Sequence, residues 1–215
     1  MTSLASGKFG VILADPPYRH RNVIPFRESL HPAANYKTMS AEDIGAIPVS
    51  SWAADPAVLV LWASPPMVDV AVDLGRAWGF SFVTAIPWMK TFPNGAPRRG
   101  AGTWFMQCWE MVLVFKRSSP GVLRDGALGL LGLLLGEPKG LFAVPPKRHH
   151  SAKPYDVHAY LETFPGPYLE LFATEDHPGW ICWGLDTGFR LSERGVEATG
   201  VLPVRRFPLL DPDPA

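Results

Sequence analysis

Short apolar runs alternate with polar stretches along most of the chain. The runs have the length of buried strands and cover residues 11–13, 58–62, 82–88, 110–115, 141–144, 168–172 and 180–184. Residues 67–78 instead repeat their apolar positions at helical spacing, and Gly79 follows as a stop signal. Ser40 and Asp43 predict the start of another short helix, which ends by Pro48. The alternation predicts an α/β fold with a mainly parallel, Rossmann-like sheet flanked by helices.

The first strand runs directly into the corner Asp15-Pro16-Pro17-Tyr18. The prolines end the strand, because proline fixes φ and cannot donate to a β ladder. Asp15 is therefore expected at the carboxyl end of a parallel strand, where open α/β sheets bind ligands. A carboxylate, a nearby carbonyl and an aromatic ring suit an amine-bearing ring: the oxygens accept from the amine and Tyr18 stacks on the base. The structural alternative is that Asp15 only forms a turn or caps a helix.

Two polar loops follow strands and are candidates for binding phosphates. Residues 19–31 are rich in arginine and histidine, and residues 91–102 contain Arg98 and Arg99. Loops at the carboxyl ends of strands often carry function, although both are also compatible with ordinary solvated loops. Residues 121–140 have irregularly spaced glycines among leucines, which favours an insertion or lid over a dinucleotide-binding loop.

Lys153 precedes Pro154, a residue that suits the first turn of a helix running to residue 163. An ammonium group at a helix N-terminus is a favourable seat for a carboxylate. The neighbouring pair His149-His150 has no carboxylate or cysteine at ligand spacing, so we predict no metal site.

The composition agrees with one globular domain of 215 residues, 47% of them hydrophobic. The formal net charge is zero, so positive charge for nucleic acid must be local or come from a partner. No signal sequence or membrane span is expected, which makes the cytoplasm the default location. We assign residues 1–191 to the domain and residues 192–215 to a loosely attached tail without clear periodicity.

Several motifs occur in a fixed order. They are Asp15-Pro16-Pro17-Tyr18, Tyr36-Lys37-Thr38-Met39-Ser40, Trp88-Met89-Lys90-Thr91, Glu110, His150-Ser151-Ala152-Lys153-Pro154, Leu169-Glu170-Leu171-Phe172 and Trp180 to Gly184. Together they resemble the N(6)-adenine methyltransferase family that includes the catalytic subunit of the eukaryotic mRNA adenosine methylase and many bacterial and phage members.

The resemblance implies a Rossmann-like methyltransferase that uses S-adenosylmethionine. It assigns the catalytic corner to Asp15, Pro16, Pro17 and Tyr18, and cofactor binding to four residues: Asp15, Lys153, Leu185 and Asp186. The family usually has an Asn followed by Gln or Glu at the last two positions, and of the residues here only Asp186 can accept from ribose hydroxyls. We assign substrate binding to Tyr36, Lys90, Arg98, Arg99 and Glu110.

The leading hypothesis is methyl transfer to the N(6) amine of adenine in nucleic acid, with DNA favoured over RNA and the target base single-stranded or flipped out. One alternative is a non-catalytic nucleic-acid-binding partner of an active subunit. Another is a cytosine-N(4) methyltransferase, because the same corner can grip either amine. Both a homodimer and a heterodimer are compatible with the sequence.

Overall fold

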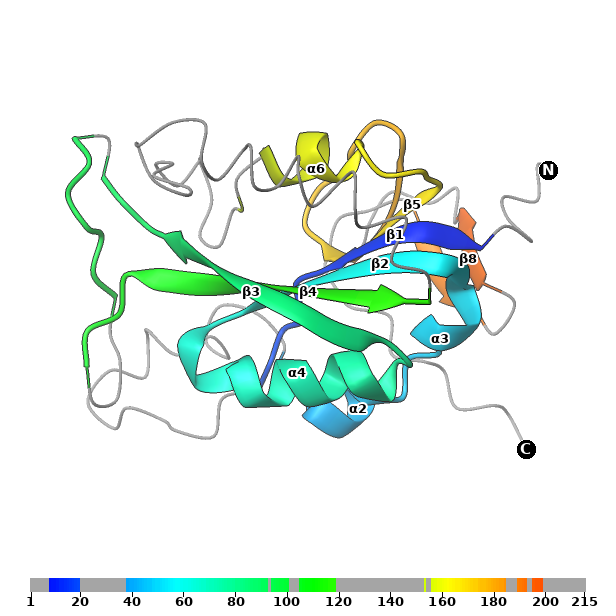
Figure 1. Ribbon diagram of the computed structural model, residues 1–215, viewed down its shortest axis with the longest axis horizontal. Helices are drawn as coiled ribbons and strands as arrows, with labels where there is room; N and C mark the ends of the chain where they lie inside the picture. Colours follow the sequence, from blue (N-terminus) through cyan, green and yellow to red (C-terminus); the bar gives the residue numbers. More distant parts are fainter. Residues whose placement is uncertain are drawn as a thin grey trace.

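The computed structural model describes residues 8–19, 38–92, 94–100, 105–118, 153, 156–184, 189–192 and 195–198. A six-stranded sheet is the centre of the molecule, in the order β3-β4-β2-β1-β5-β6 (Figure 1). Its strands are β1 (Phe9–Ala14), β2 (Ala53–Ala63), β3 (Ser81–Met89), β4 (Trp109–Arg117), β5 (Tyr168–Ala173) and β6 (Trp180–Gly184). The predicted α/β fold with helices flanking a sheet is confirmed.

Most of the sheet is parallel, as expected. β1 pairs in parallel with β2 and with β5, and β5 pairs in parallel with β6. β4 runs the other way and pairs antiparallel with both β2 and β3. As a consequence, β4 begins at the edge of the sheet where the other strands end.

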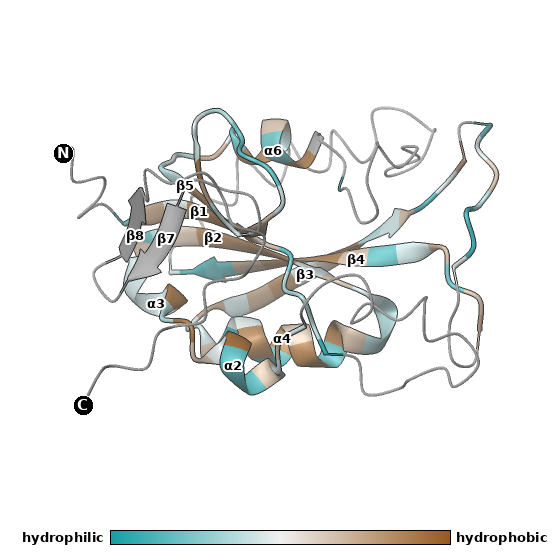
Figure 2. Cartoon of the chain, turned by 180° about the vertical axis from the view of Figure 1, so that it is seen from behind, coloured by the Kyte–Doolittle hydropathy of each residue, from teal (hydrophilic) through white to brown (hydrophobic). Residues whose placement is uncertain are grey.

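Helices cover both faces of the sheet (Figures 1 and 2). The short helices α2 (Ala41–Gly45) and α3 (Val49–Trp52) and the longer α4 (Val68–Ala77) pack on one face, and α6 (Asp156–Leu161) packs on the other. Alternate residues of the central strands divide between the two cores; in β2, Leu59 and Leu61 face α4, while Val60 and Trp62 face α6. Such burial on both faces explains why the central strands are continuous apolar runs.

Local signals explain where several elements begin and end. Ser40 caps α2 by accepting from the backbone N–H of Asp43 at 3.0 Å. Gly79 follows α4 with a φ of +82°, a left-handed conformation that favours glycine. In α4 itself, a Cβ on Gly75 would lie 2.3 Å from the ring of Phe115, so glycine permits the close approach of helix and sheet.

Beyond the main sheet, β7 (Phe189–Ser192) and β8 (Gly195–Ala198) form a separate antiparallel pair. The pattern of these short segments did not predict this hairpin. The expected lid at 121–140 and strand at 141–144 lie outside the described residues, as do residues 199–215, so the domain boundary near residue 191 stays a prediction. No helix of the described part is long and apolar enough to cross a bilayer.

Candidate active site

Four charged side chains from separate parts of the chain meet at one edge of the sheet. Asp15 follows β1, Lys90 follows β3, and Glu110 is the second residue of β4. Glu110 reaches this edge because β4 is antiparallel and begins where its neighbours end. Lys153 lies shortly before α6 and completes the group. The site therefore lies at the carboxyl edge of the parallel strands, where the sequence predicted it.

Ion pairs connect the four side chains in a row. The Nζ of Lys153 lies 3.0 Å from Oδ2 of Asp15 and 2.8 Å from Oε2 of Glu110. Lys90 pairs with the other carboxylate oxygen of Glu110, Oε1. Lys153 thus bridges two carboxylates, and Glu110 bridges two ammonium groups. We call Asp15, Lys153, Glu110 and Lys90 the charged quartet.

Two tryptophans lie beneath the lysines of the quartet. Nζ of Lys153 is 5.1 Å from the ring centroid of Trp62, and Nζ of Lys90 is 5.1 Å from that of Trp88. The two indole rings meet edge to face at 5.5 Å, and both are buried. These cation–π contacts hold the two ammonium groups against the two tryptophan rings. No sequence pattern assigned Trp62 or Trp88 to the site, although both lie at or near the carboxyl ends of their strands.

The corner that holds Asp15 is tied to the fold by backbone hydrogen bonds. The N–H of Asp15 donates to the carbonyl of Leu171 in β5 at 3.3 Å, and the N–H of Tyr18 donates back to the carbonyl of Pro16 at 2.8 Å. The N–H of Met39 donates to the carbonyl of Pro17 at 2.8 Å. The corner is therefore pinned from both sides, and a carbonyl oxygen such as that of Pro16 keeps a second lone pair.

Tyr18 belongs largely to the core, with an exposed fraction of 6%. Its hydroxyl donates to the carbonyl of Trp62 at 3.2 Å, and this bond links the corner at Asp15 to the tryptophan beneath Lys153. Burial, together with the Asp15 charge, raises the pKa of the Tyr18 hydroxyl, so Tyr18 is neutral and can donate. The stacking of Tyr18 on a base stays a prediction.

Burial and charge set the protonation of the quartet. Burial raises the pKa of the Asp15 carboxyl; the Lys153 ammonium opposes this shift and the Glu110 carboxylate adds to it. Burial would also raise the pKa of Glu110, but Lys153 and Lys90 outweigh it and lower that pKa to about 2. Burial acts to lower the pKa of Lys153, and the two carboxylates raise it above its ordinary value. Glu110 is thus firmly ionised at neutral pH, whereas Asp15 binds a proton more readily than an exposed aspartate.

The described residues suit the methionine end of S-adenosylmethionine. That end carries an α-carboxylate and an α-ammonium group, which match the Lys153 ammonium and the Asp15 carboxylate. The hydroxyls of Ser64, just after β2, and Thr91, just after β3, are buried and have no hydrogen-bond partner among the described residues. Buried hydroxyls without partners next to a charged site are consistent with polar groups that a ligand completes.

The remaining predicted residues are placed as follows. Arg98 is half-buried, and its backbone N–H donates to the carbonyl of Lys90 at 2.8 Å; Arg99 is exposed. Tyr36, Leu185 and Asp186 lie outside the described residues. Where the structure describes the chain, no three His, Cys, Asp or Glu side chains are arranged to hold a metal ion, and the His149-His150 pair lies outside that part.

Known proteins are similar to this chain over the region that contains the sheet and the site. The MT-A70 family model matches residues 9–186. The type II methyltransferase M.MunI of Mycoplasma sp is 29% identical over 197 residues, which cover 83% of this chain and 78% of the relative. A putative N(6)-adenosine-methyltransferase MT-A70-like protein of Medicago truncatula is 29% identical over 89% of this chain and 29% of its own length. The N(6)-adenine-specific methyltransferase METTL4 of Homo sapiens is 24% identical over 82% of this chain and 37% of its own length.

Proposed function

Because the chain belongs to the MT-A70 family, we propose that it transfers a methyl group from S-adenosylmethionine to the N(6) amine of adenine in a nucleic acid. The observation that carries this proposal is the ion pair of 3.0 Å between Asp15 and Lys153 at the carboxyl edge of the sheet. It joins a hydrogen-bond acceptor for an amine to a cation for a carboxylate in one site.

S-adenosylmethionine would supply a methyl group that its sulfonium already activates. Lys153 would hold the carboxylate of the cofactor, and Asp186 would accept from its ribose hydroxyls. Glu110 has a positioning role in this scheme, because it keeps a second carboxylate on Lys153 at 2.8 Å and so limits where the ammonium group can lie. Lys90 anchors Glu110 from the other side.

The chain's own part in the reaction is to bind and orient the adenine amine. The Asp15 carboxylate accepts one N–H of the amine, and the carbonyl of Pro16 accepts the other through its free lone pair. These two bonds would fix the orientation of the amine for attack, and such positioning can contribute several kcal/mol. Methyl transfer would form the N–C bond as the S–C bond of the sulfonium breaks, and Asp15 is the adjacent acceptor for the proton that the methylated nitrogen would lose. The burial that raises the pKa of Asp15 favours this role.

We favour DNA over RNA as the polymer. The support is the likeness to the type II methyltransferase M.MunI, which is 29% identical over 197 residues. The same corner would accept any exocyclic amine of similar geometry, so substrate identity has to be measured directly.

The test is methyl transfer by the purified full-length chain. Single-stranded DNA, duplex DNA and RNA of the same adenine-containing sequence are incubated with methyl-labelled S-adenosylmethionine, and the digested nucleosides are identified by mass spectrometry. We expect N(6)-methyladenine, most of it in DNA, and loss of at least ~100-fold in rate for Asp15→Asn, since misplacing the reacting groups costs on that order.

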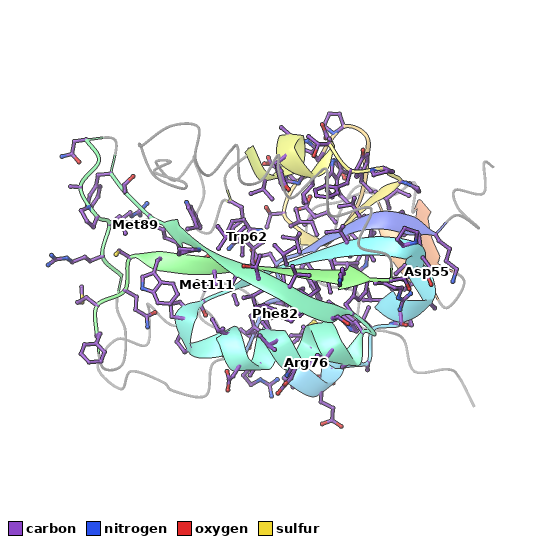
Figure 3. The ribbon with its side chains drawn as sticks, viewed as in Figure 1. Asp55, Trp62, Arg76, Phe82, Met89 and Met111 are labelled. Carbon is purple, nitrogen blue, oxygen red and sulfur yellow. The ribbon has the colours of Figure 1, made fainter. Side chains whose placement is uncertain are left out.

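Asp55→Asn is the matched control. Asp55 also precedes a proline, but it is exposed near the amino end of β2, at the far edge of the sheet (Figure 3). Asp15→Asn should unfold at a urea concentration near that of the control. Methyl transfer by a folded Asp15→Asn protein at the rate of the control would refute the role of Asp15, and methylcytosine as the product would reassign the substrate.

A further inference from the structure

The hairpin that joins β3 to β4 continues past the sheet as an arm. We define the arm as residues 89–109, of which the structure describes 89–92, 94–100 and 105–109. Backbone hydrogen bonds hold its two sides together. The N–H of Lys90 donates to the carbonyl of Cys108 at 2.6 Å. The N–H of Gly100 donates to the carbonyl of Gln107 at 2.6 Å, and the N–H of Gln107 donates back to the carbonyl of Gly100 at 3.1 Å. The arm projects beyond the carboxyl edge, at the left of the view in Figure 1. The described parts of the arm thus extend the sheet next to the charged quartet.

The arm exposes an unusual number of large apolar side chains. Five of the seven exposed large hydrophobic residues in the described part of the chain belong to it: Met89, Phe92, Phe105, Met106 and Trp109. Phe105 is 80% exposed and Met106 61%. Exposed apolar groups gathered in this way mark a binding surface more often than scattered ones do.

The arm is also cationic, although the whole chain is neutral. It contains Lys90, Arg98 and Arg99 and no Asp or Glu, so its formal charge is +3. Of the 20 Lys and Arg residues of the chain, 17 remain outside the arm against 20 Asp and Glu, which gives the rest of the chain −3. The arm is therefore a local cationic segment of a neutral chain, as nucleic-acid binding requires, and Arg98 and Arg99 are its cations that lie outside the charged quartet.

Charged contacts connect the arm to the catalytic corner. Lys90 belongs to the arm and pairs with Glu110, which accepts from Lys153, and Lys153 pairs with Asp15. A nucleotide held at Asp15 would therefore have its neighbours close to the base of the arm.

We propose that the arm binds unpaired nucleotides that flank the target adenine, with Phe105 stacking on a base and Arg98 and Arg99 contacting phosphates. This inference rests on the proposed function, because it places the target base at Asp15. Aromatic rings beside arginines form the platforms on which single strands stack, and a base inside a duplex has no free face to offer them. A second copy of the chain fits less well, because a symmetric contact of arm with arm would bring Arg98 and Arg99 close to the same two cations of the other copy.

Binding of oligonucleotides tests this inference without any methyl transfer. The full-length protein is titrated into a fluorescein-labelled single-stranded DNA of a dozen nucleotides with one central adenine, and into its duplex, at several salt concentrations. Phe105→Ala should weaken single-strand binding by roughly 5- to 160-fold, the range for loss of one base stack, and Phe105→Trp should restore it. Replacing both Arg98 and Arg99 by Gln should reduce the slope of log K against log salt by about 1.4, at about 0.7 for each phosphate contact with a single strand.

Val83→Ala and Arg76→Gln are the matched controls, because both residues are exposed but lie outside the arm. Affinity for S-adenosylmethionine, measured by calorimetry, should be the same in all variants. Equal affinity for single strand and duplex, or unchanged binding by Phe105→Ala, would overturn the inference. A wild-type dimer that Phe105→Ala converts to monomer in sedimentation velocity would also overturn it, in favour of a protein interface. Binding that shows the expected effects while wild-type protein transfers no methyl group would support the arm and refute the proposed function.

Discussion

The carboxylate of Glu110 is the most sharply testable member of the charged quartet. It lies between the ammonium groups of Lys153 and Lys90, and its side chain is 15% exposed. Although burial opposes ionisation, the two cations lower the pKa of Glu110 from 4.5 to about 2. At about 1.4 kcal/mol per pKa unit, this shift corresponds to about 3 kcal/mol of stability at neutral pH. Glu110→Gln keeps the size of the side chain but removes the charge, so we expect a loss of about that magnitude.

The pH dependence has a definite sign. Because the pKa of Glu110 is lower in the folded than in the unfolded protein, the unfolded state binds more protons between pH 4.5 and about 2. The stabilisation is therefore complete above pH 4.5 and is lost as the pH falls toward 2. The difference in free energy of unfolding between wild type and Glu110→Gln should be largest at neutral pH and should shrink over this window.

Urea denaturation at a series of pH values measures that difference directly. Asp73→Asn is the control, because Asp73 forms an ion pair of 3.2 Å with Arg76 on the exposed side of α4, where its side chain is 79% exposed. Exposed pairs contribute about 0–1 kcal/mol, so this variant should resemble wild type. A Glu110→Gln protein as stable as wild type at pH 7, or a difference that does not change on acidification, would refute the electrostatic reasoning.

Two further predictions concern local features outside the site. Ser40→Ala removes the side-chain acceptor for the N–H of Asp43 at the start of α2 and should destabilise the protein by about 1 kcal/mol in urea denaturation, whereas Ser40→Thr should keep most of the stability; equal stability of the alanine variant and wild type would contradict the cap. Cys182 is fully buried, and burial raises the pKa of its thiol to about 12, whereas Cys108 is partly exposed. Alkylation of the native protein at pH 8 should therefore modify Cys108 and leave Cys182 unmodified, as measured by peptide mass spectrometry. Labelling of Cys182 at a rate near that of Cys108 would mean that the packing of β6 opens readily.

Much of the local structure could be predicted from the sequence. Apolar runs and cap signals located β1, α2, α4 and β5 close to their observed bounds, because burial on both sheet faces and helix capping leave direct marks in the sequence. The short helix α3 and the hairpin of β7 and β8 were missed, since elements of four residues are too short to show a period.

The direction of β4 was not predictable from its own pattern. A buried strand reads the same whether it pairs parallel or antiparallel, because the alternation of side chains reports burial and carries no direction. Its antiparallel pairing is what brings Glu110 to the carboxyl edge. Separate motifs pointed to Asp15, Lys90, Glu110 and Lys153 individually, but none of them predicted that these residues form one row of ion pairs.

By itself, then, the sequence determined the fold class, the corner at Asp15 and the family resemblance, because each depends on short stretches of neighbouring residues. Only the tertiary structure decided that Lys153 bridges Asp15 and Glu110 above the Trp62 ring, and that the arm carries its apolar side chains into solvent. Both features depend on distances between residues far apart in the chain. Those distances are fixed by strand order and direction, which are properties of the whole packed sheet.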